Sequence, residues 1–419
     1  MVVMNKLENF RRNLSPTHFN INKDVLSTAQ EVLESSDFPT TKNEKWKYSR
    51  LGRLSKLELQ QSKKLSATVS VEKICDEAIT IEINNGHIQS IPLLPKGIAI
   101  KSFNNCSKEE LSKIGNYLNL ENEVFHSLNS LYANDGIYIE TEKNVKIDQE
   151  IHLIHNTLGN NEFIPFRVFV NCHSSSELQI VELFQSNDTE QSFINPVIEA
   201  NVEQNAKLSI TKVQIEEGNN FHIGSDFITQ KKDSYYKCNT ISLKGQFIRN
   251  NIHVKVAGSN CETHLNGAYL IEGNQHIDNQ TMIDHLTPNC ESHELYKGIL
   301  DEKATAVFNG KVIVHEDAQK INAYQSNANV LLSDDANVNS KPELEIYADD
   351  VKCSHGSTTG QLDEKAIYYL RSRGISKRKA QTIVSQAFIR DVFLKIDSEK
   401  TKSFIHKKLE ALHNWELLS

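Results

Sequence analysis

The stretch CETHLNGAYLI, residues 261–271, decides the fold class of this 419-residue chain. Just before it, IHVKVAG at 252–258 alternates apolar and polar residues, as a β-strand does when its two faces meet different surroundings. The five residues NCETH at 260–264 return as NCESH at 289–293, and the longer stretch shares its pattern with ATAVFNGKVIV at 304–314. Echoes at periods of about 20 to 50 residues are typical of chains that stack one structural unit on the next.

The same alternation continues on both sides of this stretch, from about residue 66 to about residue 350. The runs are short, and Gly, Asp and above all Asn separate them. Asn suits tight corners because it tolerates left-handed backbone and bonds to neighbouring backbone groups. Many short strands between such corners predict a mainly β fold. From the pattern alone, a stacked β-helix and a β-sandwich both remain open.

Helical patterns flank the β-rich region. Asn22 is placed to cap a helix that stops before Pro39. Gly374 ends a second helical pattern near the C-terminus, and Ser376 can begin a third, whose apolar stripe can pack on its own domain or on a partner. We therefore expect three parts: an N-terminal helical and basic region at 1–65, a β-rich region at 66–355 and a C-terminal helical domain at 356–419.

Composition and absent motifs narrow the classes of function. The net charge is −8, so we expect no nucleic-acid partner, which would need a basic stripe. The chain has neither an apolar run of about 18 residues nor a signal sequence, so we expect a cytoplasmic protein without a membrane span. Seven scattered cysteines without a C-x-x-C pair argue against a disulfide framework and a zinc ribbon. No nucleotide-binding or hydrolase fingerprint occurs, so we expect no enzyme activity of its own.

One short motif carries candidate chemistry. In DDVKCSHGST, residues 349–358, Cys353 and His355 stand two apart. On a strand they would project from the same face. A thiolate and an imidazole suit zinc, copper(I) or an iron–sulfur cluster, and the same two groups can also form a nucleophile–base pair.

A long segment of the chain resembles a known family. Residues 310–393, from GKVIVHEDAQKINAY to SKRKAQTIVSQAFIRDVF, are similar to the shared core of the SufB/SufD proteins of iron–sulfur cluster assembly. FPTTKNEKWKYSRL near the start and FHSLNSLYANDGIYI at 125–139 resemble the family more weakly. Within the family, DDVKCSHGSTTGQLD and the modest chain length are most like SufD.

The resemblance implies a right-handed parallel β-helix flanked by an N-terminal helical region and a C-terminal helical domain. It implies a scaffold that joins a SufB-type partner through the β-helix and a SufC-type ABC ATPase through the C-terminal helices, with a homodimer as a further option. It places the family's cluster-assembly histidine on His355, with Cys353 beside it. These residues would hold iron or a nascent cluster transiently at the interface with the SufB-type partner, and no tightly bound cofactor is expected on the chain alone.

Two other functions compete with this one. The chain could be SufB-like and nucleate the cluster itself, although no other cysteine has a neighbour at a ligand-like spacing. It could also be a β-helix enzyme that acts on polysaccharide, which the absent export signal argues against. For the motif itself, the alternative is structural: CSHG would form the last corner of the β-helix, and His355 would hold the turn into the helical domain.

Overall fold

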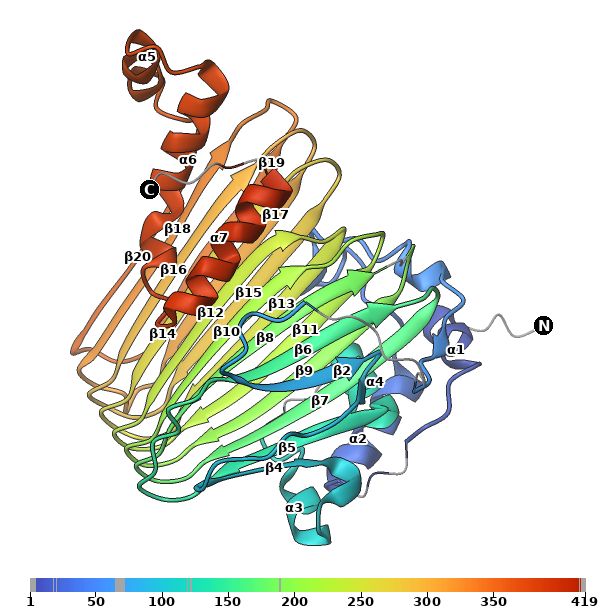
Figure 1. The fold of residues 1–419 in the computed structure, drawn as a ribbon. Helices are drawn as coiled ribbons and strands as arrows, with labels where there is room; N and C mark the ends of the chain where they lie inside the picture. The colour runs from blue at the N-terminus through green and yellow to red at the C-terminus, as the bar shows by residue number, and fades with distance from the viewer. Residues whose placement is uncertain are drawn as a thin grey trace.

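The computed structural model describes residues 5–17, 19, 21–64, 72–118, 120, 123–187, 190–413 and 415. Successive strands of the central region enter two sheets in turn, and neighbours within each sheet pair in parallel. The chain therefore winds as a parallel β-helix with two broad faces (Figure 1). This confirms the β-helix and excludes the sandwich, whose two sheets consist of antiparallel strands.

The two sheets are called sheet A and sheet B. Sheet A contains β1 (Gln60–Gln61), β4 (Ile98–Ser102), β5 (Asp135–Thr141), β7 (Glu162–Cys172), β9 (Phe193–Val202), β11 (Phe221–Gln230), β13 (Phe247–Val256), β15 (His276–His285), β17 (Thr305–Val314) and β19 (Asn337–Ile346). Sheet B contains β2 (Ile79–Asn84), β3 (His87–Ile88), β6 (Ile151–Leu158), β8 (Glu177–Asn187), β10 (Lys207–Ile215), β12 (Tyr235–Lys244), β14 (Glu262–Ile271), β16 (Glu291–Leu300), β18 (Ile321–Leu331) and β20 (Val351–Gly360).

Asparagines occupy several corners between the sheets, as expected. Five of them adopt left-handed backbone with φ between 58° and 63°: Asn144, Asn161, Asn205, Asn260 and Asn289. The echo NCETH/NCESH follows from this geometry, since Glu262 of β14 lies opposite Glu291 of β16 on the next turn. The other echo does not mark stacked turns, because 261–271 enters sheet B whereas 304–314 enters sheet A.

Apolar ladders fill the space between the sheets. In one such ladder of sheet A, from β7 to β19, each side chain pairs in register with its counterpart on the previous turn. The ladder consists of Val170, Ala200, Ile228, Val254, Ile283, Val312 and Leu344. All of them are buried except Leu344, which is only partly covered. Each turn thus buries its apolar face on its neighbours, which is how solenoids are stabilised.

The N-terminal region covers the outer face of sheet A. It contains α1 (Lys6–Arg11), α2 (Lys23–Ser35) and the short 3-10 helices η1 (Glu44–Trp46) and η2 (Leu54–Lys56), and α4 (Val124–Tyr132) packs with them. The Asn22 side chain accepts from the Asp24 N–H, which confirms the predicted cap. Trp46 is buried, and the Arg249 guanidinium lies 3.9 Å from its ring centroid. The basic segment around Trp46 is therefore docked on the sheet by its aromatic residue.

The C-terminal helices are α5 (Glu364–Ser372), α6 (Lys377–Phe393) and α7 (Glu399–His413). The Ser376 side chain caps α6, and Gly374 adopts φ 85° just before it, as predicted. Apolar residues of α6 and α7, such as Ile389 and Phe404, pack against the outer face of sheet B. Their apolar stripe therefore covers this chain's own sheet. α5 lies farthest from the sheets (Figure 1).

The two ends of the β-helix differ. At the first end, β3 and β4 pair antiparallel with β2 and β5, and η3 (Phe103–Asn105) and α3 (Lys108–Lys113) lie beside them. At the other end β19 and β20 are the outermost strands of their sheets. β20 runs to Gly360, past the expected boundary at 355, and the boundary at 65–66 lies outside the described residues. No helix among the described residues is long and apolar enough to cross a membrane.

Candidate ligand site at the open end of the β-helix

Cys353 and His355 lie on β20, the outermost strand of sheet B. Their partners on β18 are Ala323 and Gln325, which are both buried in the interior of the β-helix. Because paired positions of a parallel sheet share a face, Cys353 and His355 occupy interior-facing positions. The sequence prediction that they share a strand face is therefore confirmed.

The Cys353 thiol is half-buried and packs against the apolar core. Burial raises its pKa, an effect that a hydrogen bond from the Ala323 backbone partly offsets. The isolated chain therefore holds a protonated thiol at neutral pH. A soft metal ion that binds here must displace this proton, so binding must weaken as the pH falls.

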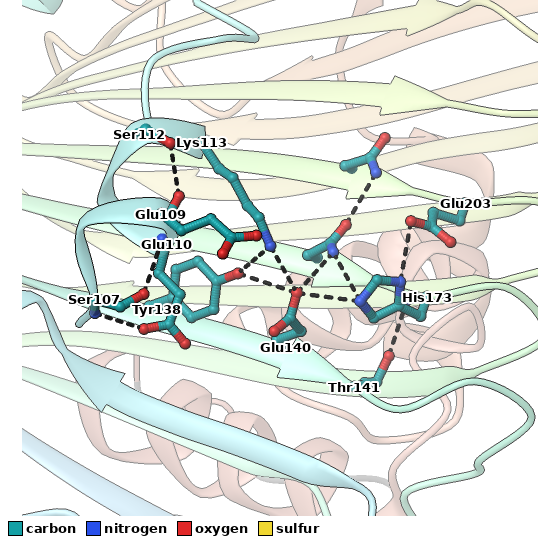
Figure 2. Close-up of polar contacts among 12 residues, drawn as sticks. Ser107, Glu109, Glu110, Ser112, Lys113, Tyr138, Glu140, Thr141, His173 and Glu203 are labelled. Carbon is teal, nitrogen blue, oxygen red and sulfur yellow. Dashed lines mark hydrogen bonds and ion pairs between the residues drawn. The ribbon is translucent and has the colours of Figure 1, made fainter. Parts of the chain in front are cut away.

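The His355 side chain is exposed, and its ring forms no hydrogen bond or ion pair with another described residue. Other histidines of the chain are held tightly. His173, just after β7, lies between Glu140 and Glu203, with Nε2 3.1 Å from Glu140 Oε1 and Nδ1 3.0 Å from Glu203 Oε1 (Figure 2). The imidazole of His355 is thus available to a ligand or partner.

The structural alternative for this motif is wrong. Cys353 and Gly356 both lie inside β20 rather than at a corner. The His355 ring forms no hydrogen bond or ion pair with the described residues between β20 and α5, so it does not hold that turn. Within the described part of the chain, no three His, Cys, Asp or Glu side chains are grouped so as to hold a metal ion. Cys353 and His355 alone leave a coordination shell unfinished, because protein-bound zinc usually has about four ligands and iron–sulfur clusters about four thiolates.

The structure adds residues that the sequence did not reveal. Gln325 lies opposite His355, and Glu294 of β16 lies opposite Gln325 on the turn before. The Gln325 Nε2 donates to Glu294 Oε2 at 2.6 Å, and burial raises the pKa of Glu294 to about 7. Only the register of the strands brings these residues together, and no short spacing in the sequence signals it.

Two further cysteines also meet. Cys261 and Cys290 are buried at successive corners, and the Cys261 N–H donates to the Cys290 sulfur at 3.4 Å. The echo NCETH/NCESH is the signal that could have predicted this pair. Cys172 and Cys238 are buried singly, as expected for packed thiols, and burial raises the pKa of each to about 12.

Comparisons with known proteins cover most of the chain. Residues 155–388 match the family described as "SUF system FeS cluster assembly, SufBD core domain", and residues 7–153 match "SufBD protein N-terminal region". An iron–sulfur cluster assembly SufBD family protein of Synechocystis sp. is 29% identical over 87% of this chain and 85% of its own length. Escherichia coli SufD, an iron–sulfur cluster assembly protein, is 28% identical over 86% of this chain and 85% of its own.

Proposed function

Because the chain belongs to the SufBD family of iron–sulfur cluster assembly proteins, we propose that it is a SufD-type scaffold subunit. It would work in the cytoplasm with a SufB-type partner and a SufC-type ABC ATPase to assemble iron–sulfur clusters and pass them on. The similarity to Escherichia coli SufD supports the SufD type. The chain itself would catalyse no reaction, and ATP hydrolysis would belong to the SufC-type partner.

The observation that carries this proposal is the unfinished ligand pair on an open strand edge. Cys353 and His355 lie on the inward-facing side of β20, where no further turn of the described chain covers them, and β20 has no neighbouring strand on that side. A SufB-type chain that docks against this edge would place its own ligands opposite them. The imidazole and the thiolate would then bind iron or a nascent cluster as cargo, and a protonated thiol must lose its proton on binding.

The surface for the SufC-type ATPase would be α5 and the start of α6. Tyr368 and Tyr369 of α5 are 76% and 58% exposed, and three basic residues, Lys377, Arg378 and Lys379, begin α6. Aromatic and basic side chains of this kind are frequent anchors of protein interfaces. Point substitutions such as Tyr368→Ala test this surface better than truncation, because α6 and α7 cover an apolar face of sheet B.

The experiment uses the complex of all three subunits, reconstituted anaerobically with iron and sulfide. We expect His355→Ala to fold and to assemble with both partners, because its side chain is exposed on the last turn. Its iron and sulfide content should fall sharply, since one coordination position is opened. Cys353→Ser should cause a weaker loss, because a hard hydroxyl replaces a soft thiolate. His264→Ala is the matched control, since His264 lies on the outer face of sheet B, and full cluster content in His355→Ala would contradict the proposal.

A second candidate function is that of a SufB-like chain that nucleates the cluster by itself. The stacked pair Cys261 and Cys290 favours it, because it brings two thiols together inside one chain. Reconstitution of the isolated chain distinguishes the two candidates. A stable brown holo-protein that is lost in Cys261→Ser would support the SufB-like chain, whereas a colourless product supports the SufD type. The polysaccharide-acting enzyme has no support in the family matches.

A further inference from the structure

A buried amide lies directly behind the candidate histidine. Gln325 occupies the middle of three register positions on successive turns of sheet B, between Glu294 on β16 and His355 on β20. Its Nε2 donates to Glu294 Oε2 at 2.6 Å, so the amide nitrogen faces back toward the preceding turn. The other amide atom, Oε1, is buried and has no hydrogen-bond partner.

An unpartnered carbonyl of this kind calls for a donor. A buried acceptor left without a partner costs about 1–3 kcal/mol, so native structures seldom leave one. Neighbouring strands are about 4.8 Å apart, so side chains at paired positions on one face lie within reach of each other. The paired position on the next turn is His355, whose ring forms no hydrogen bond or ion pair with another described residue.

We propose that Gln325 is a positioning residue for His355, and this inference rests on the proposed function. The Gln325 carbonyl accepts the N–H of one ring nitrogen of His355, and Glu294 fixes the amide in the orientation that offers this carbonyl. The other ring nitrogen then keeps its lone pair and points toward the metal position beyond β20. Histidine ligands generally need such an outer partner, because it sets both the tautomer and the direction of the ring.

The arrangement also explains why the Glu294 carboxyl group is buried on the turn before Gln325. Without Glu294, the Gln325 amide could turn over and present its N–H₂ group to the histidine, which would favour the wrong ring nitrogen. With the ionised Glu294 carboxylate as acceptor, only one orientation of the amide keeps both hydrogen bonds. Glu294 thus orients Gln325, Gln325 orients His355, and only His355 contacts the iron or the cluster.

The tautomer of His355 in the full chain tests the inference without any metal. With histidines labelled with ¹⁵N, the His355 ring signals are identified as those missing from His355→Ala. We expect one dominant tautomer in the wild type and a mixture in Gln325→Met, which is similar in size but offers no acceptor. Ser326→Ala, an exposed neighbour on the same strand, should leave the signals unchanged.

A double variant guards against a folding defect in Gln325→Met. In Glu294→Gln combined with Gln325→Glu, the amide and the carboxylate exchange places, so the hydrogen bond between them persists and an oxygen still faces His355. This variant should restore the single tautomer, which a merely structural role of Gln325 would not require. An unchanged tautomer in a folded Gln325→Met, or a mixture in the exchanged pair, would overturn the inference.

Binding of Fe(II) alone to the three-subunit complex is measured under anaerobic conditions. It distinguishes the proposed ligand role of His355 from the proposed positioning role of Gln325. Loss of an outer partner of a metal ligand typically weakens binding by about 10- to 100-fold, and we expect a loss of this size for Gln325→Met. If His355→Ala binds Fe(II) like the wild type, the proposed function itself is wrong. If His355→Ala weakens binding but a folded Gln325→Met does not, only the role of Gln325 is wrong.

Discussion

At one end of the β-helix, His173 lies between the carboxylates of Glu140 and Glu203, and Glu140 also accepts from Lys113 and Tyr138 (Figure 2). At the other end, His355 lies on an exposed strand without a partner among the described residues. The backbone differs in the same way. The first end, which we call the capped end, finishes in antiparallel strand pairs. The other end, which we call the open end, finishes in β19 and β20, the outermost parallel strands of their sheets.

The difference is what we expect if the chain binds its proposed partners at the open end. An outermost strand carries backbone groups without partners and tends to pair with another chain unless something covers it. The open end also exposes apolar side chains, with Ile346 at 40% and Tyr347 at 63% exposure. At the capped end the His173 imidazole has two carboxylate partners, whereas the open end leaves candidate ligands, strand edges and apolar side chains exposed. An assembly surface at the open end accounts for all three.

The largest expected effect on stability comes from truncating the core at the two ends. Ile139 of β5 is fully buried at the capped end, and Leu344 of β19 is partly covered at the open end. Ile139→Ala should lower the free energy of unfolding by about 2–5 kcal/mol, because it leaves a cavity that the surroundings cannot fill. Leu344→Ala should cost less than half as much. Urea unfolding of the isolated chain measures both.

Adding the SufB-type partner should sharpen this contrast. If the partner covers the open end, Leu344→Ala becomes a substitution in a buried interface and should weaken binding, whereas Ile139→Ala should not. Equal destabilisation of the isolated chain by the two substitutions would mean that the open end is covered in solution already.

Sequence reasoning could predict the parts of this picture that depend on local chemistry. Asn22 and Ser376 cap helices because their side chains reach backbone N–H groups two or three residues on, and Asn260 turns a corner through its own backbone. The shared face of Cys353 and His355 follows from their two-residue spacing on any strand, but the sequence left open whether their segment is a strand or a corner. The family resemblance supplied the β-helix, which the structure confirms, and the role proposed for His355.

Register could not be predicted in this way. Gln325 meets His355 only because each turn has a particular length, and corners of different lengths shift that length from turn to turn. Cys261 and Cys290 were missed for the same reason, although their shared motif hinted at stacking. The last turn is open because no further strand of the described chain pairs with β19 or β20. A local sequence pattern cannot show that such a strand is absent.

The second prediction compares a carboxyl group from each end as the pH changes. Burial raises the pKa of Glu294 from 4.5 to about 7, so the native state holds its proton longer than the unfolded chain does. This contribution to stability is complete below pH 4.5 and is lost as the pH rises through 7. The shift corresponds to about 3 kcal/mol. Glu294→Gln should remove this loss in unfolding experiments between pH 4.5 and 8.

Glu140 should behave in the opposite way. Burial acts to raise its pKa, but hydrogen bonds from Asn171 and the charge of Lys113 outweigh burial and lower it. Its contribution is therefore present above the ordinary pKa of 4.5 and is lost as the pH falls below that value. Glu140→Gln should flatten the acid side of the stability profile and leave the neutral side unchanged. If the contributions of Glu294 and Glu140 to the free energy of unfolding changed in the same direction with pH, the contrast between the two ends would be contradicted.

The third prediction uses a glycine from each end. A Cβ added to Gly136 of β5 would lie 2.4 Å from the buried Phe103 ring, whereas a Cβ on Gly356 of β20 meets nothing within 4 Å. Gly136→Val should therefore lower the free energy of unfolding by about 1–3 kcal/mol through overpacking. Gly356→Val should change it by less than about 0.5 kcal/mol, as at other exposed positions. Thermal and urea unfolding should agree on this order, and strong destabilisation by Gly356→Val would mean that the last turn is packed in solution.

The smallest expected effect on stability belongs to charges at Gly356, and there the change should appear in assembly instead. We expect the isolated chain to pair with a second copy through β20, because two such edges can satisfy each other by two-fold strand pairing. Gly356 lies near the middle of β20, so that pairing would bring the two copies of this residue close together. Gly356→Lys and Gly356→Glu should each place like charges there, which disfavours the pair, while the open space around Gly356 keeps the single chain stable. Light scattering at tens of micromolar should then show a dimer for the wild type, monomers for each variant and a restored dimer when the two variants are mixed. A monomeric wild-type chain would contradict the predicted homodimer. If the two variants still formed dimers, the dimer contact would lie outside β20.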